Sequence, residues 1–395
     1  MSRRVTLTLS MSSSNTVSTK NEANSNDIRM LPDNATRQEF ENHQSLYLTD
    51  GNVILTASSA TRPNSFTVFR VHQSLLSRHS SILKEMLADT DVLEEHDGVP
   101  CIHMSDLEEE LECLLKYIYG DLTLPLRRLA PSILTTVSHL LKLSSKYSIP
   151  TIRKQLIPRL EQDWPPTLFH WDTLELEISG LLSLWSDDPL PSYFDDYLPE
   201  PASALRLGFE CAVPSILPSA FYHLNRLGVF QDRARKREDP ENLSRKSLEK
   251  RNADWNRLAS SDLISLMKGQ HHLKYTAKEM VFDEPRLYDL STHYHTLRGL
   301  TNTGRNRGES EKKKEKQLCA IDAQWEFWAQ VKDDWEANSN DVLRYLNDRV
   351  NTVQTRSEIC PSCRTDIQKA LKHMRQEIWT KLPFYFDLAK RESLT

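Results

Sequence analysis

The stretch that decides the fold is Phe69-Arg70-Val71-His72-Gln73-Ser74-Leu75-Leu76, where the hydrophobic period changes. Before it, apolar residues recur at every second position, at Val53 and Leu55 and again at Phe66 and Val68, which is typical of strands. Residues 58–64 between them are rich in turn formers and predict that the two strands are antiparallel. After the stretch, apolar residues recur at helical spacings and predict short helices. These residues are Leu75, Leu76, Ile82, Leu83, Met86 and Leu87.

Strand and helix patterns continue towards the C-terminus. Asp97-Gly98 predicts a turn, and residues 100–104 predict a short strand. Ser105-Asp106-Leu107-Glu108 predicts the start of a helix, with cap chemistry and an acidic first turn. We expect two more helices, from Pro131 to Tyr147 and from Pro150 to Trp164. Together these patterns predict an α+β domain.

Three motifs in this region, with matching gaps, make residues 45–164 resemble a BTB/POZ domain. This family places two strands before a Phe-x-Val/Ala-His-x-x-Leu-Leu box, which matches residues 69–76. A strand leading into Asp and a helix ending in Tyr-Ile-Tyr match Asp106 and residues 117–119. A third motif, Leu-x-Leu-Ala-x-x-Tyr, matches residues 141–147, with Ser144 where the family prefers Ala.

The resemblance implies a small sheet packed on a helical cluster and a protein–protein interaction module without an active site. Its motif residues are Phe69, Val71, His72, Leu75, Leu76, Asp106, Tyr117 and Tyr119. In this box we expect His72 to fix the strand-to-helix corner by hydrogen bonding rather than to act as a catalytic base. We expect Tyr117 and Tyr119 to be core or groove residues. The partners expected are other proteins, a second copy of the chain or a cullin.

Features outside the three motifs resemble BTB proteins expanded in basidiomycete fungi. They are Asp97-Gly98-Val99-Pro100, Leu217-Pro218-Ser219-Ala220-Phe221-Tyr222, Cys360-Pro361-Ser362-Cys363 and Trp379-Thr380-Lys381-Leu382-Pro383. With them the resemblance covers most of the chain, and it is densest in residues 45–164.

Two positions bear on self-association. In the zinc-finger-linked BTB branch, a buried Asp and a basic residue take part in a domain-swapped dimer; the equivalents here are Asn52 and Gln73. Both are uncharged, and replacing both partners of a buried ion pair together avoids the penalty of leaving one charge unpaired. We therefore expect a monomer, or a weaker and differently arranged dimer.

Composition limits the class of protein. The chain has 395 residues, 50 Lys and Arg, 55 Asp and Glu, and a net charge of -5, so it has no global attraction to nucleic acid or anionic lipid. No run approaches the roughly 18 apolar residues of a membrane span, and the start lacks the pattern of a secretory signal. Six cysteines make no disulfide framework, so we expect a nuclear or cytoplasmic protein. Only ten glycines, no phosphate-binding loop and no hydrolase motif indicate that it is not an enzyme.

The chain divides into five predicted segments. They are a disordered tail (1–42), the BTB/POZ domain (43–164), a helical extension (165–230), a charged, partly disordered insertion (231–317) and a C-terminal helical hairpin (318–395). In the hairpin one apolar stripe comprises Leu343, Leu346, Val350 and Val353, and a second comprises Ile367, Leu371, Met374 and Ile378. Most of the chain after residue 164 is therefore expected to be helical.

The pair Cys360 and Cys363 lies between the two stripes and has the spacing of half a zinc site. A full site needs two more ligands, for which Cys319 and His373 are the nearest candidates and Cys211 is possible. No second Cys-x-x-Cys is present, so two buried thiols are favoured over zinc, a redox pair or a disulfide. We therefore expect no cofactor, with zinc as the open alternative.

Two further patterns suggest alternative roles. Residues 233–251 hold two basic clusters that resemble a bipartite nuclear import signal; a solvated charged helix is the other interpretation, and nucleic-acid binding is not favoured. This leaves a nuclear transcription or chromatin regulator as one alternative.

Val92-Leu93-Glu94 fits the apolar-x-Glu triplet of BTB domains that serve as substrate adaptors of cullin ubiquitin ligases. A cullin adaptor is therefore the second alternative.

Overall fold

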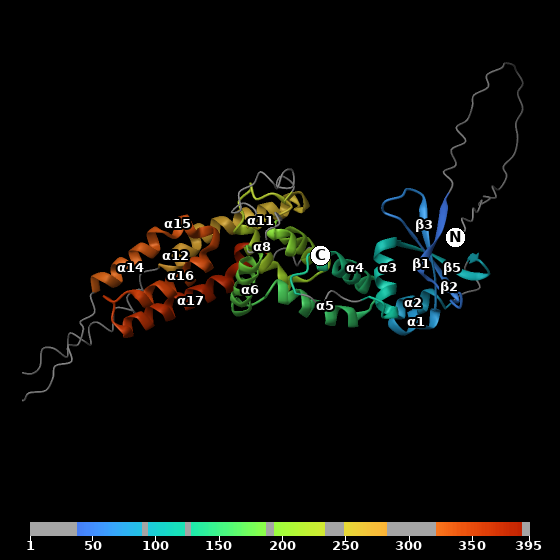
Figure 1. Cartoon of the computed structure of the whole chain (residues 1–395), viewed down its shortest axis with the longest axis horizontal. Coiled ribbons are helices and arrows are strands. Elements are labelled where there is room, and N and C mark those ends of the chain that lie inside the picture. Colours follow the sequence, from blue (N-terminus) through green and yellow to red (C-terminus); the bar gives the residue numbers. More distant parts are fainter. Residues whose placement is uncertain are drawn as a thin grey trace, which may run out of the picture. The chain divides into compact units, whose positions relative to one another are not determined.

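We describe a computed structural model of the chain, in which residues 38–88, 94–122, 128–186, 193–233, 249–282 and 321–388 are described (Figure 1). These residues fall into two compact units. The N-terminal unit comprises Met1–Leu126 and Thr135–Leu156, and the C-terminal unit comprises Arg127–Leu134 and Ile157–Thr395. The prediction for residues 1–37 lies outside the described residues.

A five-stranded mixed sheet forms the framework of the N-terminal unit, with the strand order β1-β3-β2-β5-β4. The strands are β1 (Glu39–Tyr47), β2 (Val53–Ser58), β3 (Ser65–Val71), β4 (Glu94–His96) and β5 (Val99–Leu107). β2 and β3 are antiparallel, as the turn formers between them predict, whereas β1 lies parallel to β3 and β2 parallel to β5. Asp97 and Gly98 join β4 to β5 with positive φ values of 52° and 69°, which the tight turn requires and glycine adopts readily.

Strand β1 corrects the predicted boundary of the tail. Residues 39–42, assigned to disorder from the sequence, pair with residues 65–68 of β3. Only Leu46 of this strand is fully buried, so its side chains do not show the apolar alternation that reveals a strand. The backbone ladder to β3, which no local pattern records, holds this strand in place.

Five described helices lie between or after these strands, and α3 packs on the sheet (Figure 1). They are α1 (Gln73–His79), α2 (Ser81–Met86), α3 (Glu108–Tyr119), α4 (Ile133–Lys146) and α5 (Pro150–Asp163). α3 has the predicted acidic first turn, with Glu108, Glu109 and Glu110. The predicted cap is wrong: β5 continues to Leu107, and Asp106 is buried in the strand. Its carboxylate accepts hydrogen bonds from Tyr147 and Lys146, so it serves a contact about 40 residues away in sequence rather than the helix start.

The C-terminal unit is helical. Its α-helices are α6 (Leu168–Ser186), α7 (Pro201–Glu210), α8 (Leu217–Asn225), α11 (Ser260–His271), α12 (Ala277–Val281), α14 (Ile321–Asp333), α15 (Trp335–Asn338), α16 (Val342–Thr355) and α17 (Pro361–Tyr385). A π-helical turn, His272–Thr276, joins α11 to α12, and short 3-10 turns occupy Phe194–Tyr197, Pro214–Ile216, Trp255–Arg257 and Ser339–Asp341. None of the described helices is long and apolar enough to cross a membrane.

Residues 249–282 differ from the charged, partly disordered insertion predicted there. They fold into α11, the π-helical turn and α12, with Leu258, Leu266 and Leu273 buried. A Cβ at Gly269 would lie 1.9 Å from the ring of Phe386, so α11 packs directly on the end of the chain that follows α17. Exposed Ile264 and Met267 blur the apolar periodicity of α11, which is why the sequence does not reveal it. Residues 234–248 and 283–320 lie outside the described residues.

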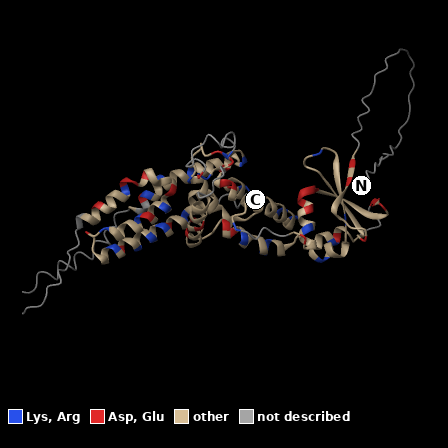
Figure 2. Ribbon diagram, viewed as in Figure 1, with Lys and Arg blue, Asp and Glu red and all other residues tan. Residues whose placement is uncertain are grey.

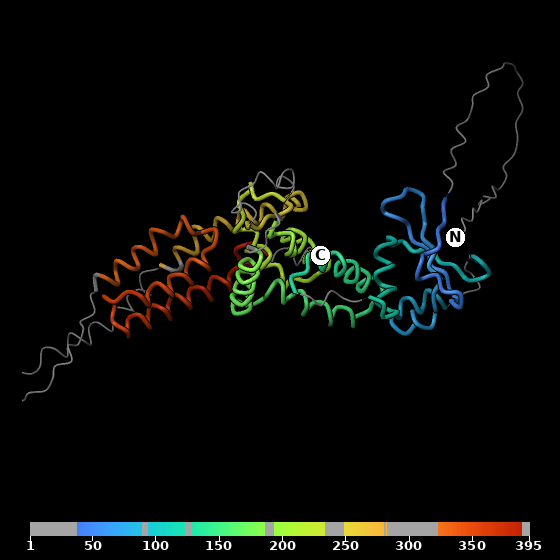
Figure 3. Tube along the Cα trace, in the orientation of Figure 1, coloured from blue at the N-terminus to red at the C-terminus, as the bar shows by residue number. Residues whose placement is uncertain are grey.

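The two apolar stripes of the C-terminal segment lie on α16 and α17, which are adjacent helices (Figure 3), and all eight residues are buried. The long helix α17 also reaches other parts of the unit. The buried guanidinium of Arg375 pairs with Asp172 of α6 at 2.5 and 3.0 Å and donates to the carbonyl of Leu343 at 2.9 Å. The indole of Trp379 donates to the carbonyl of Pro166. The three segments predicted after residue 164 therefore form one compact unit.

Candidate protein-interaction surface

The box residues form the corner between β3 and α1. Phe69 and Val71 are buried in β3, Leu76 is buried in α1, and Leu75 is half-buried. The Tyr119 hydroxyl at the end of α3 lies 2.9 Å from both the backbone nitrogen and Nδ1 of His72.

Hydrogen bonds at this corner hold the ring of His72 in place. The Tyr119 hydroxyl oxygen accepts the backbone N–H of His72 and is also hydrogen-bonded to Nδ1 of its ring. On the other side of the ring, Nε2 lies 3.4 Å from the Asp50 carboxylate. Burial raises the pKa of Tyr119, so its hydroxyl stays protonated at neutral pH. His72 is thus held by hydrogen bonds at the strand-to-helix corner.

A second link joins the other two motifs. Asp106 accepts from the hydroxyl of Tyr147 and from Lys146. Burial and the Asp106 carboxylate raise the pKa of Tyr147, so Tyr147 remains a neutral donor. Ser144, where the family prefers Ala, is buried and donates to the carbonyl of Leu141 at 2.8 Å, so its hydroxyl has a partner. Tyr117 is half-buried and donates to Gln155.

The equivalents of the dimer pocket, Asn52 and Gln73, lie together. The Asn52 side-chain oxygen accepts the Gln73 backbone N–H at 2.9 Å, and the Gln73 amide donates to the carbonyl of Leu87 at 2.5 Å. These neutral groups are hydrogen-bonded within one chain. The expectation of a monomer, or of a differently arranged dimer, stays a prediction.

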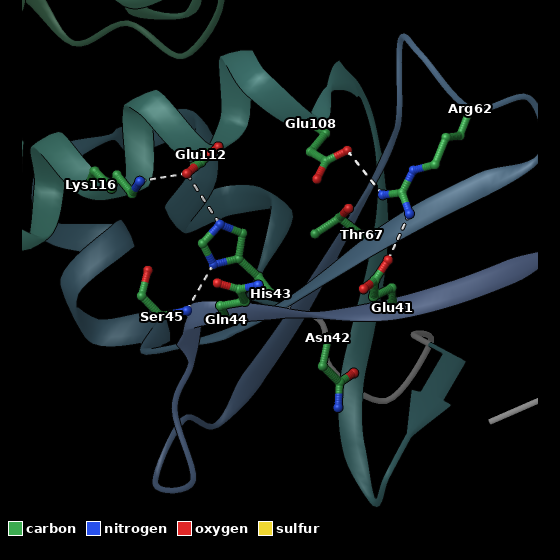
Figure 4. A pocket seen from close by; sticks show the side chains of 10 residues that line it. All are labelled: Glu41, Asn42, His43, Gln44, Ser45, Arg62, Thr67, Glu108, Glu112 and Lys116. Carbon is green, nitrogen blue, oxygen red and sulfur yellow. Dashed lines mark hydrogen bonds and ion pairs between the residues drawn. The ribbon is translucent and has the colours of Figure 1, made fainter. Parts of the chain in front are cut away.

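A pocket of about 380 Å³ lies between β1 and α3 (Figure 4). Its lining residues are Glu41, Asn42, His43, Gln44, Ser45, Arg62, Thr67, Glu108, Glu112 and Lys116. Most of them are charged or polar, so the pocket suits ionic and hydrogen-bonding groups of a partner.

Ion pairs organise the charged side chains of the pocket. The Glu112 carboxylate lies 2.5 Å from the Lys116 ammonium and 3.3 Å from Nε2 of His43. Burial opposes ionisation of Glu112, but Lys116 and His43 outweigh it and lower the carboxyl pKa. Arg62, in the loop between β2 and β3, pairs with Glu41 at 2.7 Å and lies 4.0 Å from Glu108.

His43 is the central residue of this pocket, and sequence analysis missed it. Its Nδ1 accepts the backbone N–H groups of Ser45 at 3.2 Å and Leu46 at 3.0 Å, in the irregular part of β1. Its ring stacks on Phe69 with 4.9 Å between centroids. Because Nδ1 is an acceptor, the ring proton is on Nε2, which faces Glu112. No sequence motif marks a histidine within a strand irregularity, so no local signal could have identified this role.

Three carboxylates line the pocket and three more lie on the same two elements, and together the six give this face an acidic character, which Figure 2 shows in red on β1 and the first turns of α3. They are Glu39, Glu41, Glu108, Glu109, Glu110 and Glu112. Three cations lie among them: Arg62, Lys116 and Lys142, of which Lys142 is 3.3 Å from Glu110. We call this set of six carboxylates and the pocket the β1–α3 face.

The zinc candidates are not gathered into one site in the described residues. Cys360 is the half-buried residue before α17, Cys363 is buried in its first turn, and Cys211 is buried at the end of α7. His373 is exposed on α17, ten residues and about 15 Å of helix after Cys363, so the two cannot bind one ion. No group of three or more His, Cys, Asp or Glu among the described residues could hold a metal. Cys319 lies outside them.

The two sequence patterns for alternative roles are only partly described. Of residues 233–251, Arg233 pairs with Asp196 at 3.4 Å, and Arg251 pairs with buried Asp195 at 2.8 Å. The other basic residues of both clusters lie outside the described residues, apart from Lys250. Glu94 lies 3.3 Å from His103, whereas Val92 and Leu93 are outside the described residues.

Residues 65–163 match the family model of the BTB/POZ domain. The match begins at the first residue of β3 and ends at the last residue of α5, and it includes the three motifs. The chain therefore contains a BTB/POZ domain, a protein–protein interaction module whose members bind other proteins, self-associate and bind cullins. Comparison with curated proteins and with solved structures gave no match.

Proposed function

We propose that this protein is a non-enzymatic adaptor or scaffold whose BTB/POZ domain binds a protein partner through the β1–α3 face. The observation that carries the proposal is a pocket lined by Glu41, Glu108 and Glu112, on a face with six carboxylates, in the unit that holds the BTB/POZ domain. Ion pairs and hydrogen bonds of this kind support recognition, because they select a complementary charge pattern.

The charge of the face indicates the chemistry of the partner. Carboxylates outnumber cations around the pocket, so a segment rich in Lys or Arg is complementary to it. Glu112, Lys116 and His43 line the pocket, where an arriving guanidinium or ammonium would compete with Lys116 for the carboxylate. We expect association to weaken as salt concentration rises, because exposed charges are screened.

Affinity purification of the full chain followed by mass spectrometry tests the proposal. The variant Glu109→Lys with Glu110→Lys reverses two charges of the face; a matched control, Glu358→Lys with Asp366→Lys, reverses two acidic residues of the C-terminal unit. Loss of partners from the first variant, with retention by the second, supports the proposal. Equal retention by both variants, or binding that is insensitive to salt, contradicts it.

Adaptor activity for a cullin ubiquitin ligase is the second candidate, because BTB domains bind cullins. Co-purification of a cullin with the full chain, and its loss on Leu93→Ala with Glu94→Ala, would support this role. Purification of other partners without a cullin would leave the general adaptor role standing.

A nuclear regulator is the third candidate, and we propose a nuclear or cytoplasmic location. Support comes from the basic residues of the 233–251 segment. Fluorescence imaging of the full chain, compared with Arg235→Ala, Lys236→Ala and Arg237→Ala combined, tests this location. A nuclear signal that the triple variant abolishes supports import; an unchanged distribution contradicts the role of this segment.

A further inference from the structure

Helix α6 carries an uncharged exposed face. Phe169 and Leu176 each keep 75% of their surface exposed, and Leu184 keeps 72%. Thr173 and Gly180 lie between them on the same side of the helix and are also exposed, and the space around the Gly180 Cα is open. At 100° per residue these five positions span less than a quarter of the helix circumference. They therefore form one continuous stripe, which we call the α6 stripe.

The rest of α6 fixes this orientation. Leu174 and Trp185 on the opposite side are buried in an apolar cluster of the C-terminal unit. Each acidic side chain of the helix is paired within the unit, in the ion pairs Asp172–Arg375, Glu175–Arg226 and Glu177–Arg128. The α6 stripe is thus both apolar and free of ionic groups, which is uncommon for a solvent-facing helix surface.

The spacing of the stripe is symmetric along the helix. About a point midway between positions 176 and 177, Phe169 is related to Leu184, and Thr173 to Gly180. An antiparallel copy of the helix therefore places Phe169 against Leu184 and the small residue Thr173 against Gly180. Leu176 then meets its own equivalent at the axis. This is the self-complementarity that a two-fold symmetric interface requires.

We propose that the α6 stripe binds the α6 stripe of a second copy of this chain, antiparallel and about a two-fold axis beside Leu176. Since the stripe is neutral and its flanking acids are already paired, the two copies meet without charge repulsion. A membrane surface suits the stripe less well, because α6 has three acidic residues and no Lys or Arg. The proposal does not depend on what the β1–α3 face binds.

Sedimentation equilibrium of the full chain gives the first test. One helix face is smaller than a standard interface, so we expect a dissociation constant of about 10 to several hundred micromolar. Leu176→Glu should weaken the dimer by about ten-fold or more, because it places two carboxylates at the axis. The control Val229→Glu adds the same charge at an exposed apolar residue, 72% exposed, outside α6 and should leave association unchanged. Circular dichroism verifies that both variants fold.

Disulfide cross-linking gives the second test and separates this contact from self-association of the BTB domain. In the antiparallel pair, position 173 lies opposite position 180 of the other copy, so Thr173→Cys with Gly180→Cys should form a covalent dimer on mild oxidation. Either cysteine alone lies roughly 10 Å along the axis from its own equivalent, beyond the reach of a disulfide, and should cross-link no more than the unsubstituted chain.

Three outcomes overturn the proposal. They are a monomer up to several hundred micromolar, a dimer that Leu176→Glu leaves intact, and cross-linking of the double cysteine variant no greater than that of the single ones. A dimer held by the BTB domain would give the second of these outcomes, so the two kinds of self-association are distinguishable.

Discussion

At the scale of single residues, the BTB/POZ motif works through hydrogen bonds between distant positions. Tyr119 satisfies both a backbone donor and the ring of His72, and Asp106 receives Tyr147. Burial raises the pKa of both tyrosine hydroxyls, so both stay protonated at neutral pH. The motif residues therefore form pairs in the structure: His72 with Tyr119, and Asp106 with Tyr147.

Tyr119→Phe should destabilise the N-terminal unit by about 1–3 kcal/mol, because it leaves the partly buried His72 N–H without an acceptor. The change is measured by urea denaturation of the full chain, monitored by far-UV circular dichroism, and by hydrogen exchange of the β3 amides. Tyr117→Phe is the matched control, since its hydroxyl bonds Gln155 at an exposed site and should cost much less. Equal losses for both variants would contradict the role given to Tyr119.

Tyr147 should make stability depend on alkaline pH. Its folded-state pKa is raised above the ordinary value of about 10, so its contribution to stability is fully present below pH 10. Above pH 10 the unfolded state loses the phenolic proton while the folded state retains it, and stability should fall by up to about 1.4 kcal/mol per pH unit until the folded pKa is reached. Tyr147→Phe should reduce this slope in denaturation curves measured between about pH 9 and 11. An unchanged slope would show that Tyr147 ionises equally in both states.

At the scale of elements, β1 depends on its ladder with β3 and on His43. The imidazole replaces two missing backbone acceptors where the register shifts, and it links the strand to α3 through Glu112. The β1–α3 face therefore depends on a strand with little buried apolar surface.

His43→Ala should release β1 locally while the rest of the sheet stays folded, because two N–H groups lose their acceptor at a cost of about 1–3 kcal/mol in total. Hydrogen exchange should accelerate across residues 39–47 and remain slow in β2 and β5. His79→Ala, at a half-buried position in the last turn of α1, is the control. Exchange in β1 that matches the unsubstituted chain would show that the ladder is sufficient without the imidazole.

At the scale of the whole molecule, contacts between distant segments define the C-terminal unit. Arg375 of α17 reaches Asp172 of α6, 203 residues earlier in the sequence, and Tyr222 of α8 bonds Asp341 and the N–H of Leu343. These contacts join the helical extension to the C-terminal hairpin.

Arg375→Met should destabilise the C-terminal unit by about 2–4 kcal/mol, because it removes a buried cation that bonds both a carboxylate and a carbonyl. Thermal denaturation monitored at the tryptophans of this unit measures the loss. Arg364→Met, on the same helix but bonded to a single exposed carbonyl, should cost less than about 1 kcal/mol. A similar loss for both would mean that side-chain packing, rather than the ion pair, is responsible.

The sequence determined those features whose cause is local. The antiparallel pair β2 and β3, the acidic first turn of α3, and the buried stripes of α16 and α17 follow from turn formers, from the charges of a helix start and from periodicity within a few residues. The BTB/POZ domain was recognisable because its three motifs keep their order and spacing, and the family match at residues 65–163 confirms it.

Only the tertiary structure decided the pairing of β1, the role of Asp106 and the position of α11. Each depends on a partner far along the chain: β3 for the strand, Tyr147 for the carboxylate, and Phe386 for the glycine of the helix. The β1–α3 face and the α6 stripe are of the same kind, because an acid near a turn or a leucine on a helix has the same local pattern whether it is covered or exposed. Periodicity records which side of an element is apolar, but the fold determines what each side meets.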